Sequence, residues 1–257
     1  MEATVHVSFT GAAEEARGYE VRIGSGLLAR IGRCLEEFCP AHRYVMIADS
    51  RVAELYGERV LRAVQESGRP AELITFPAGE SHKSRETWSE LSDRMLAAGV
   101  GRDAAVLALG GGVTGDLAGF VAATYLRGLP LVQLPTTLLA MIDSSVGGKT
   151  GVDTPAGKNL IGAFLQPARV IADTDTLRTL PAREVRGGLV EAIKHGAIAD
   201  AAYFDWIDAE RDLLLTLDAA AMVELIRRSV EIKADVVGRD EREGGLRKVL
   251  NFGHTVG

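Results

Sequence analysis

Short apolar runs typical of buried strands alternate with amphipathic stretches over the first half of the chain. The runs at 44–48, 71–76 and 104–109 are apolar and often β-branched, and they predict strands. Apolar residues at helical spacing predict helices between them, over about 52–66 and 87–98. This order is typical of a parallel sheet whose strands are joined by crossover helices, so the sequence predicts an α/β fold.

Two runs near the N-terminus alternate between apolar and polar residues. They cover 5–9 and 19–23, and period-two alternation indicates strands with one face toward water. We expect both to be exposed edge strands. A helix is expected at 27–38, where apolar residues return to helical spacing.

Strand-like runs stop toward the end of the chain, and helical spacing takes over. Helices are expected at 183–199, 202–207 and 219–237. The sequence therefore predicts an α/β domain over residues 1–178, followed by the start of an all-α domain over residues 179–257.

Charge and composition narrow the classes of function. The formal net charge is -6, and a mildly acidic chain lacks the basic face with which proteins neutralise nucleic-acid phosphates. Two cysteines, Cys34 and Cys39, do not make a disulfide framework or a cysteine-rich zinc site. No signal peptide and no apolar run of about 18 residues is evident. We expect a cytoplasmic protein with neither nucleic acid nor a membrane as partner.

A glycine-rich segment directly follows the strand expected at 104–109. Gly110, Gly111, Gly112 and Gly115 would let backbone N–H groups approach a phosphate at the start of a helix. The pattern is not an exact G-x-G-x-x-G, so a tight turn without a ligand is the alternative. Nucleotide binding and a simple turn both remain open on this segment alone.

Charged residues at other strand ends allow two interpretations. Asp49 ends the strand at 44–48 and could bond a ribose hydroxyl, although a helix N-cap is the better explanation on this residue alone. Glu80 and Lys83 lie on another strand-to-helix loop, where they could contact a ligand or simply be surface charges.

Cations gather in the segment 143–162. Lys149, Lys158 and Asn159 stand among glycines, a combination that suits a ligand with phosphate or carboxylate groups. The segment lacks the upstream glycine of a Walker A motif, so a P-loop is excluded. The alternative is a flexible loop with solvated lysines.

Two later segments carry metal-binding and cationic side chains. Glu191 and His195 lie four residues apart on an expected helix and share a face, with Lys194 beside them. Such a pair is more often surface chemistry than a metal site. Further on, Arg247, Asn251 and His254 fall at spacings of four and three, and on one helical face they would present a cation, an amide and an imidazole. His254 could join Glu191 on a metal, and Lys233 could add positive charge.

Taken together, these segments closely resemble the 3-dehydroquinate synthase family, from about Asp49 to Gly257. The resemblance is densest in GGGVTGDLAGFVAATYLRG, LPTTLLAMIDSSVGGKTGVDTPAGKNLIGAF, EAIKHG and LNFGHTVG. It implies an N-terminal Rossmann-like domain that binds NAD, and a C-terminal helical domain that supplies most ligands of a zinc or cobalt ion. It also implies a homodimer.

The resemblance assigns roles to individual residues. It places the NAD pyrophosphate on the turn formed by Gly110, Gly111, Gly112, Val113 and Asp116. It implies further NAD contacts from Asp49, Glu80, Lys83, Thr136, Thr137, Lys149, Lys158, Leu177, Thr179 and Leu180. It implies substrate-binding and catalytic roles for Asp143, Lys149, Lys158, Asn159, Lys194, Lys233, Arg247 and Asn251. It makes Glu191 and His254 metal ligands but not His195, and it extends Arg127 across the dimer interface.

The reaction implied is the conversion of 3-deoxy-D-arabino-heptulosonate 7-phosphate to 3-dehydroquinate and phosphate. It proceeds by transient oxidation with NAD, elimination of phosphate, reduction and an intramolecular aldol closure, with the metal polarising a hydroxyl. The substrate carries a phosphate and a carboxylate, so an acidic protein must gather positive charge locally to hold it.

The sequence departs from the family in one respect. The family has a second histidine soon after the position of His254, a third zinc ligand further downstream and a phosphate-binding lysine near its end. None of these precedes Gly257, and catalytic zinc normally has three protein ligands. We therefore expect this sequence to be a fragment of a longer protein.

Three other functions stay open. Another sugar phosphate cyclase would share the fold, NAD and metal, although Lys233 and Asn251 suit 3-dehydroquinate synthase better than the valiolone cyclases. A metal-dependent polyol dehydrogenase of the glycerol dehydrogenase type would release reduced cofactor. A non-enzymatic cofactor-binding remnant is the third, and the retained Lys149, Lys194 and Arg247 argue against it.

Overall fold

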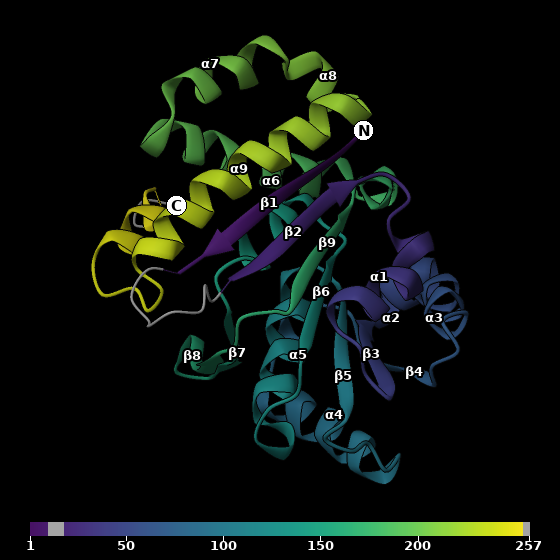
Figure 1. Ribbon diagram of the computed structural model, residues 1–257. Coiled ribbons are helices and arrows are strands. Elements are labelled where there is room, and N and C mark those ends of the chain that lie inside the picture. The colour runs from purple at the N-terminus through teal and green to yellow at the C-terminus, as the bar shows by residue number, and fades with distance from the viewer. Residues whose placement is uncertain (10–17, 254–257) are drawn as a thin grey trace.

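A seven-stranded sheet forms the centre of the computed structural model, which describes residues 1–9 and 18–253 (Figure 1). The strand order is β1-β2-β9-β6-β5-β3-β4, and every neighbouring pair is parallel except β1 with β2. The strands are β1 (Glu2–Ser8), β2 (Gly18–Gly24), β3 (Arg43–Asp49), β4 (Ala71–Phe76), β5 (Ala104–Gly110), β6 (Leu131–Pro135) and β9 (Arg169–Asp173). The expected α/β fold with a parallel sheet is confirmed.

Helices cover both faces of this sheet because successive side chains of its strands point to opposite sides. On β5, Leu107 and Leu109 pack with α1 and α3, whereas Val106 and Ala108 pack with α4 and α5. These helices are α1 (Ile31–Phe38), α2 (Ser50–Val52), α3 (Glu58–Gln65), α4 (Arg85–Ala97) and α5 (Gly112–Thr124). Short 3₁₀ or π segments, which Figure 1 leaves unlabelled, are η1 (Leu28–Arg30), η2 (Ala53–Gly57), η3 (Glu80–His82), η4 (Tyr125–Arg127) and η5 (Ala140–Ser144).

The described part of the chain after β9 is helical, as expected. It contains η6 (Thr174–Thr179), α6 (Ala182–Ala199), α7 (Ala201–Ala209), α8 (Arg211–Leu215), α9 (Ala219–Arg239) and the 3₁₀ helix η7 (Leu246–Asn251). None of the helices formed by the described residues combines the length and the apolarity of a membrane span.

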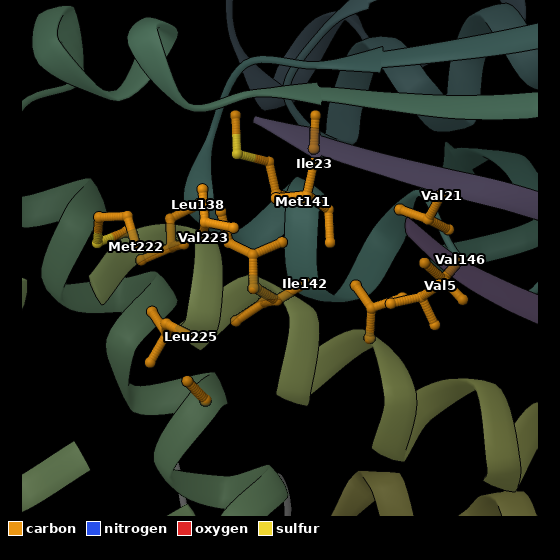
Figure 2. Packing of buried hydrophobic residues seen from close by; sticks show 14 of the residues in the cluster. Val5, Val21, Ile23, Leu138, Met141, Ile142, Val146, Met222, Val223 and Leu225 are labelled. Atoms are coloured by element: carbon orange, nitrogen blue, oxygen red, sulfur yellow. The ribbon is translucent and has the colours of Figure 1, made fainter. Parts of the chain in front are cut away.

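One hydrophobic cluster joins the sheet to the C-terminal helices. Val5 and Val21, from β1 and β2, share it with Val223 and Leu225 of α9 and with Ile142 of η5 (Figure 2). The cluster therefore crosses the expected boundary at residue 178, and a division into two domains remains a prediction.

The position of β2 differs from the expectation of two edge strands. β1 is an edge of the sheet, but β2 lies between β1 and β9. Alternation along a strand reports that one face is less buried than the other, and β2 has such a half-buried face. It does not report whether a strand lies at an edge, so the prediction for 19–23 was wrong.

A two-stranded antiparallel hairpin, β7 (Lys149–Thr154) with β8 (Gly157–Phe164), occupies part of the glycine-rich segment that carries the lysines. Gly151 is paired with Gly162. A Cβ atom on Gly162 would lie 2.1 Å from the carbonyl oxygen of Thr150, so the two backbones approach too closely for a side chain there. The sequence analysis did not predict these strands, because glycine is depleted from strands generally.

Candidate active site

Three adjacent strands end side by side at one edge of the sheet, and each carries residues that the resemblance assigns to NAD. Asp49 ends β3, Gly110 ends β5, and Thr136 and Thr137 follow β6. The amide of Thr136 donates to the carbonyl oxygen of Gly110 at 2.8 Å. After β3 the chain turns to one side of the sheet, and after β5 it turns to the other. Parallel α/β sheets bind nucleotides at the point where the connections switch sides in this way.

The glycine-rich turn leads directly into α5. Gly111 is the N-cap residue and offers no side chain to the first-turn N–H groups, which leaves these groups for an anion. A Cβ atom on Gly110 would lie 2.3 Å from Oγ1 of Thr114, and one on Gly111 would lie 3.0 Å from Cγ2 of Thr137. The segment is thus both a tight turn and an open helix N-terminus, with Val113 in its first turn.

Asp49 has the capping role that the sequence left open, and it also reaches the glycine-rich turn. Its Oδ1 accepts from the amides of Arg51 and Val52, both at 3.0 Å, and so caps α2. Its Oδ2 accepts from the Thr114 hydroxyl at 3.3 Å. The second oxygen therefore lies next to the first turn of α5.

Lys83 and Glu80 are held by other charged groups. Lys83 is buried and its ammonium lies 2.7 Å from Asp116 of α5. Burial raises the pKa of Asp116, and the charge of Lys83 opposes that rise. Glu80 pairs with Lys158 at 2.9 Å, with both side chains largely exposed.

Leu177, Thr179 and Leu180 lie on or just after η6, which follows the end of β9. Leu177 is buried in the core, and the Thr179 hydroxyl hydrogen-bonds with the hydroxyl of Tyr56. They therefore lie beyond the same edge of the sheet as the glycine-rich turn, two strands away from it.

A cavity of about 600 Å³ lies between the sheet region and the C-terminal helices. Residues expected at the site that line it are Asp116, Asp143, Lys149, Asn159, Lys194, Lys233, Arg247 and Asn251. They come from α5, η5, β7, β8, α6, α9 and η7, so the fold gathers the cationic segments of the sequence around one space.

Asp143 and Lys233 form an ion pair at this cavity, with Lys233 buried and Asp143 partly buried. The Lys233 ammonium donates to Oδ1 and to the carbonyl oxygen of Asp143, both at 2.5 Å. Burial alone would raise the pKa of Asp143, but the adjacent Lys233 outweighs it and lowers the pKa to about 2. Asp143 is therefore a carboxylate at neutral pH.

Glu191, Lys194 and His195 lie together on α6. Lys194 pairs with Glu191 and also donates to the Leu250 carbonyl at 2.6 Å. Burial lowers the pKa of His195 to about 4, so its imidazole is neutral at pH 7. Asp143, Glu191 and His195 place potential ligand atoms within 4.8 Å of one another. Glu191 as a ligand remains a prediction, and His254 lies outside the described residues.

Arg247 is a buried residue that lines the cavity, and a glycine leaves room for its guanidinium. Its guanidinium donates to the carbonyl oxygens of Gly147 at 3.1 Å and of Glu241 at 2.5 Å. Gly147 has a φ of 96°, and a Cβ atom there would lie 2.4 Å from Nη2 of Arg247. The segment is a 3₁₀ helix and not the α-helical face that the spacing suggested, yet Arg247 and Asn251 both line the cavity.

Glu243 was missed by the sequence analysis. Its carboxylate pairs with Lys149 and accepts from the Asn251 amide at 3.1 Å, which lowers its pKa. Its φ is 59°, a left-handed conformation that non-glycine residues rarely adopt outside functional sites. The only indication in the sequence was the run of charged residues before Gly244. Such a run predicts a solvated loop as readily as it predicts a functional residue.

Among the residues expected to bind or act on the substrate, Lys158 and Arg127 do not line the cavity. Lys158 is exposed on the hairpin, where its ammonium contacts Glu80. Arg127 is exposed in η4 with a φ of 73°. Its expected role concerns a second subunit.

Solved structures of two synthases share this architecture. A 2-deoxy-scyllo-inosose synthase complexed with carbaglucose-6-phosphate, NAD+ and Co2+ matches with a TM-score of 0.87 at 29% identity, covering 99% of this chain and 67% of the other. The 2-epi-5-epi-valiolone synthase of Streptomyces hygroscopicus, with NAD+ and Zn2+ bound, matches with 0.84 at 32%, covering 96% and 68%. The fold and the cavity define a sugar phosphate cyclase.

Sequence relatives narrow this class. Two protein-family models match the chain. The one described as 3-dehydroquinate synthase N-terminal matches residues 73–187, and the one described as 3-dehydroquinate synthase C-terminal matches residues 188–257. The 3-dehydroquinate synthases of Symbiobacterium thermophilum and Pelobacter propionicus are 49% and 50% identical over 240 residues, which is 93% of this chain and 67% of each relative. The chain belongs to the 3-dehydroquinate synthase family, and it spans about two thirds of the length of these relatives.

Proposed function

We propose that this chain carries the 3-dehydroquinate synthase activity, which converts 3-deoxy-D-arabino-heptulosonate 7-phosphate to 3-dehydroquinate and phosphate. The observation that supports it is the set of four cations, Lys149, Lys194, Lys233 and Arg247, around one cavity next to the glycine-rich turn. An acidic chain concentrates positive charge in this way to hold a ligand with both a phosphate and a carboxylate.

We infer a dinucleotide-binding crevice at the strand ends, where parallel α/β sheets bind nucleotides. The uncapped start of α5 would hold the pyrophosphate, and Oδ2 of Asp49 would accept from a ribose hydroxyl. When bound, NAD supplies a hydride acceptor and donor. Asp116, which contacts Lys83 and also lines the cavity, connects this crevice with the substrate site.

The carboxylates of Asp143 and Glu191 and the imidazole of His195 place potential ligand atoms within 4.8 Å of one another, and such donors suit a divalent metal ion. Glu191 and His254 would be ligands, and the metal, when bound, supplies Lewis acidity at a hydroxyl. Asp143 is ionised and can accept a hydrogen bond or a proton from a substrate hydroxyl, while Lys233 fixes its orientation.

The substrate anions would replace carboxylates that now satisfy the cations. Lys149 and Asn251 are held by Glu243, and Lys194 by Glu191. A phosphate or carboxylate that takes these donors would release Glu243 and Glu191. Lys158 and Asn159, on the exposed hairpin, would approach the ligand from the other side of the cavity.

The family also suggests an oligomeric state, a location in the cell and a division into domains. We propose a homodimer in which Arg127 reaches the partner's site, a cytoplasmic location, and a division near residue 178 into NAD-binding and helical domains. The exposed position of Arg127 in η4 is compatible with such a contact.

Phosphate release tests the proposal. A version of the chain extended at Gly257 by the C-terminal third of a relative should release one phosphate per heptulosonate phosphate with NAD and zinc present. The 257-residue chain should release phosphate more slowly, because two protein ligands hold a catalytic metal weakly. NADH should not accumulate, because the cofactor is regenerated in each turnover. NADH formed in step with substrate loss would instead indicate a polyol dehydrogenase. No release by either version would contradict the proposal.

The two functions of Asp49 can be separated by a pair of variants. Asp49→Asn should keep the cap of α2, because asparagine caps as well as aspartate, and thus retain stability. Asp49→Ala should lower the free energy of unfolding by about 0.5 to 2 kcal/mol. Both should weaken NAD binding about tenfold, which calorimetry would measure. Unchanged NAD affinity in both variants would leave Asp49 as a cap alone.

A further inference from the structure

His195 is a fully buried residue whose imidazole lacks any hydrogen-bond partner within residues 1–9 and 18–253. Its exposed fraction is 0%, and neither Nδ1 nor Nε2 is paired. A neutral imidazole has one N–H donor and one acceptor nitrogen, and burying them unpaired costs free energy. A group of this kind in a native protein calls for an explanation.

Its polar neighbours are the carboxylates at the candidate metal site. Nε2 lies 4.0 Å from Oε1 of Glu191, one turn earlier on α6. The potential ligand atoms of Asp143 are also within 4.8 Å of it. The gap to Glu191 is about 1 Å longer than a hydrogen bond, so a small movement of the Glu191 side chain would close it.

Glu191 is at present held by Lys194, which has a second partner. The Lys194 ammonium also donates to the Leu250 carbonyl, so it remains bonded if it releases Glu191. A carboxylate that binds a metal through one oxygen keeps the other free to accept a hydrogen bond. Such outer partners orient metal ligands and raise metal affinity.

We infer that His195 is a positioning residue whose Nε2–H donates to Glu191 and holds this carboxylate in its metal-binding orientation. The inference rests on the proposed metal site, and it gives a role to a residue that the family resemblance leaves without one. The unpaired imidazole then costs free energy in the metal-free protein. The same imidazole strengthens metal binding once it donates to Glu191.

Cobalt(II) titration of the chain extended at Gly257 by the C-terminal third of a relative, followed by its visible absorbance and by calorimetry, tests the inference. His195→Leu should weaken cobalt binding about 10- to 100-fold. In metal-free protein the same variant should raise Tm by about 2 to 4 °C, because it removes the unpaired polar atoms. A residue that only packs would lower Tm and leave cobalt affinity unchanged.

Two conservative variants locate the nitrogen that acts. His195→Gln can place an amide donor near the Nε2 position and should restore cobalt affinity, whereas His195→Asn places it near Nδ1 and should not. A loss in His195→Leu that glutamine does not restore would put the imidazole on the metal itself and overturn the positioning role. Unchanged affinity in His195→Leu would overturn it directly.

Glu191→Gln separates this inference from the proposal on which it rests. If wild-type chain binds cobalt and Glu191→Gln does not, the metal site stands and the His195 variants decide the inference alone. If Glu191→Gln binds cobalt like wild type, or wild type binds none, the proposed metal site fails and the role of His195 fails with it.

Discussion

Replacing Lys233 by methionine should lower the free energy of unfolding by up to about 3 kcal/mol, because it leaves the partly buried Asp143 carboxylate, which is 30% exposed, without its partner. The Lys233 side chain is 6% exposed, and its ammonium donates to Asp143 at 2.5 Å. Urea denaturation of metal-free protein would measure the loss. The double variant Asp143→Asn/Lys233→Met should recover part of it, since neither charge then remains.

The exposed pair of Lys158 with Glu80 gives the matched control. Lys158 is 71% exposed, so Lys158→Met should change stability by less than about 1 kcal/mol. Similar losses in Lys158→Met and Lys233→Met would show that the Asp143 pair is effectively solvated.

The Lys233→Met deficit should also shrink as the pH falls. In wild type, Lys233 lowers the pKa of Asp143 from 3.8 to about 2, so the contribution of this carboxylate is present above pH 3.8 and lost as pH falls toward 2. Without Lys233, burial should raise that pKa above its usual value. The folded variant then takes up a proton before the unfolded chain does, and it gains stability relative to wild type between pH 7 and 4.

Gly147→Ala should be strongly destabilising, because it combines a left-handed backbone conformation with a clash against Arg247. At a φ of 96° an alanine side chain is strained by about 1 to 2 kcal/mol. Its methyl group would also lie 2.4 Å from Nη2 of Arg247 and displace a buried, hydrogen-bonded guanidinium, at a further cost of about 1.5 to 3 kcal/mol. We expect a loss of roughly 3 kcal/mol in stability and, because Arg247 lines the cavity, weaker binding of orthophosphate.

Gly187→Ala is the control for this experiment. Gly187 lies within α6, and a Cβ atom there would have no atom within 4 Å. Alanine is favoured over glycine in a helix, so stability should rise by up to about 1 kcal/mol. If Gly147→Ala behaves like Gly187→Ala in denaturation and in phosphate calorimetry, Arg247 does not depend on this close approach.

Local pattern predicted much of the fold, since apolar periodicity reports which faces are buried. The strand at 71–76 and the helix at 183–199 were found to within a residue or two. The order of strands was beyond such reasoning, because β2 owes its inner position to β9, which begins at Arg169. The hairpin β7–β8 was missed because its glycines, which let the two strands pair closely, interrupt the apolar pattern that predicts a strand.

Spacing along the chain also identified the cationic segments of the site but not their partners. Lys149 and Glu243 are 94 residues apart, and Lys233 and Asp143 are 90 apart. Nothing local to either member predicts the other, because tertiary packing brings them together. His195 shows the same limit, since its spacing from Glu191 indicated a shared helical face but not complete burial without a partner.

The packing of β1 against α9 bears on the order in which the molecule can be assembled. A Cβ atom on Gly238 would lie 2.4 Å from the Ser8 carbonyl oxygen, and Val5 shares a cluster with Val223. Part of the cover of β1 therefore emerges only with a helix that lies more than 200 residues later in the chain. Until then the apolar face of β1 lacks the α9 part of its native cover on a nascent chain, and it is a site for chaperone binding or mispairing. Because α9 also carries Lys233, a fusion or deletion at the N-terminus would disturb the cavity from the far end of the sequence.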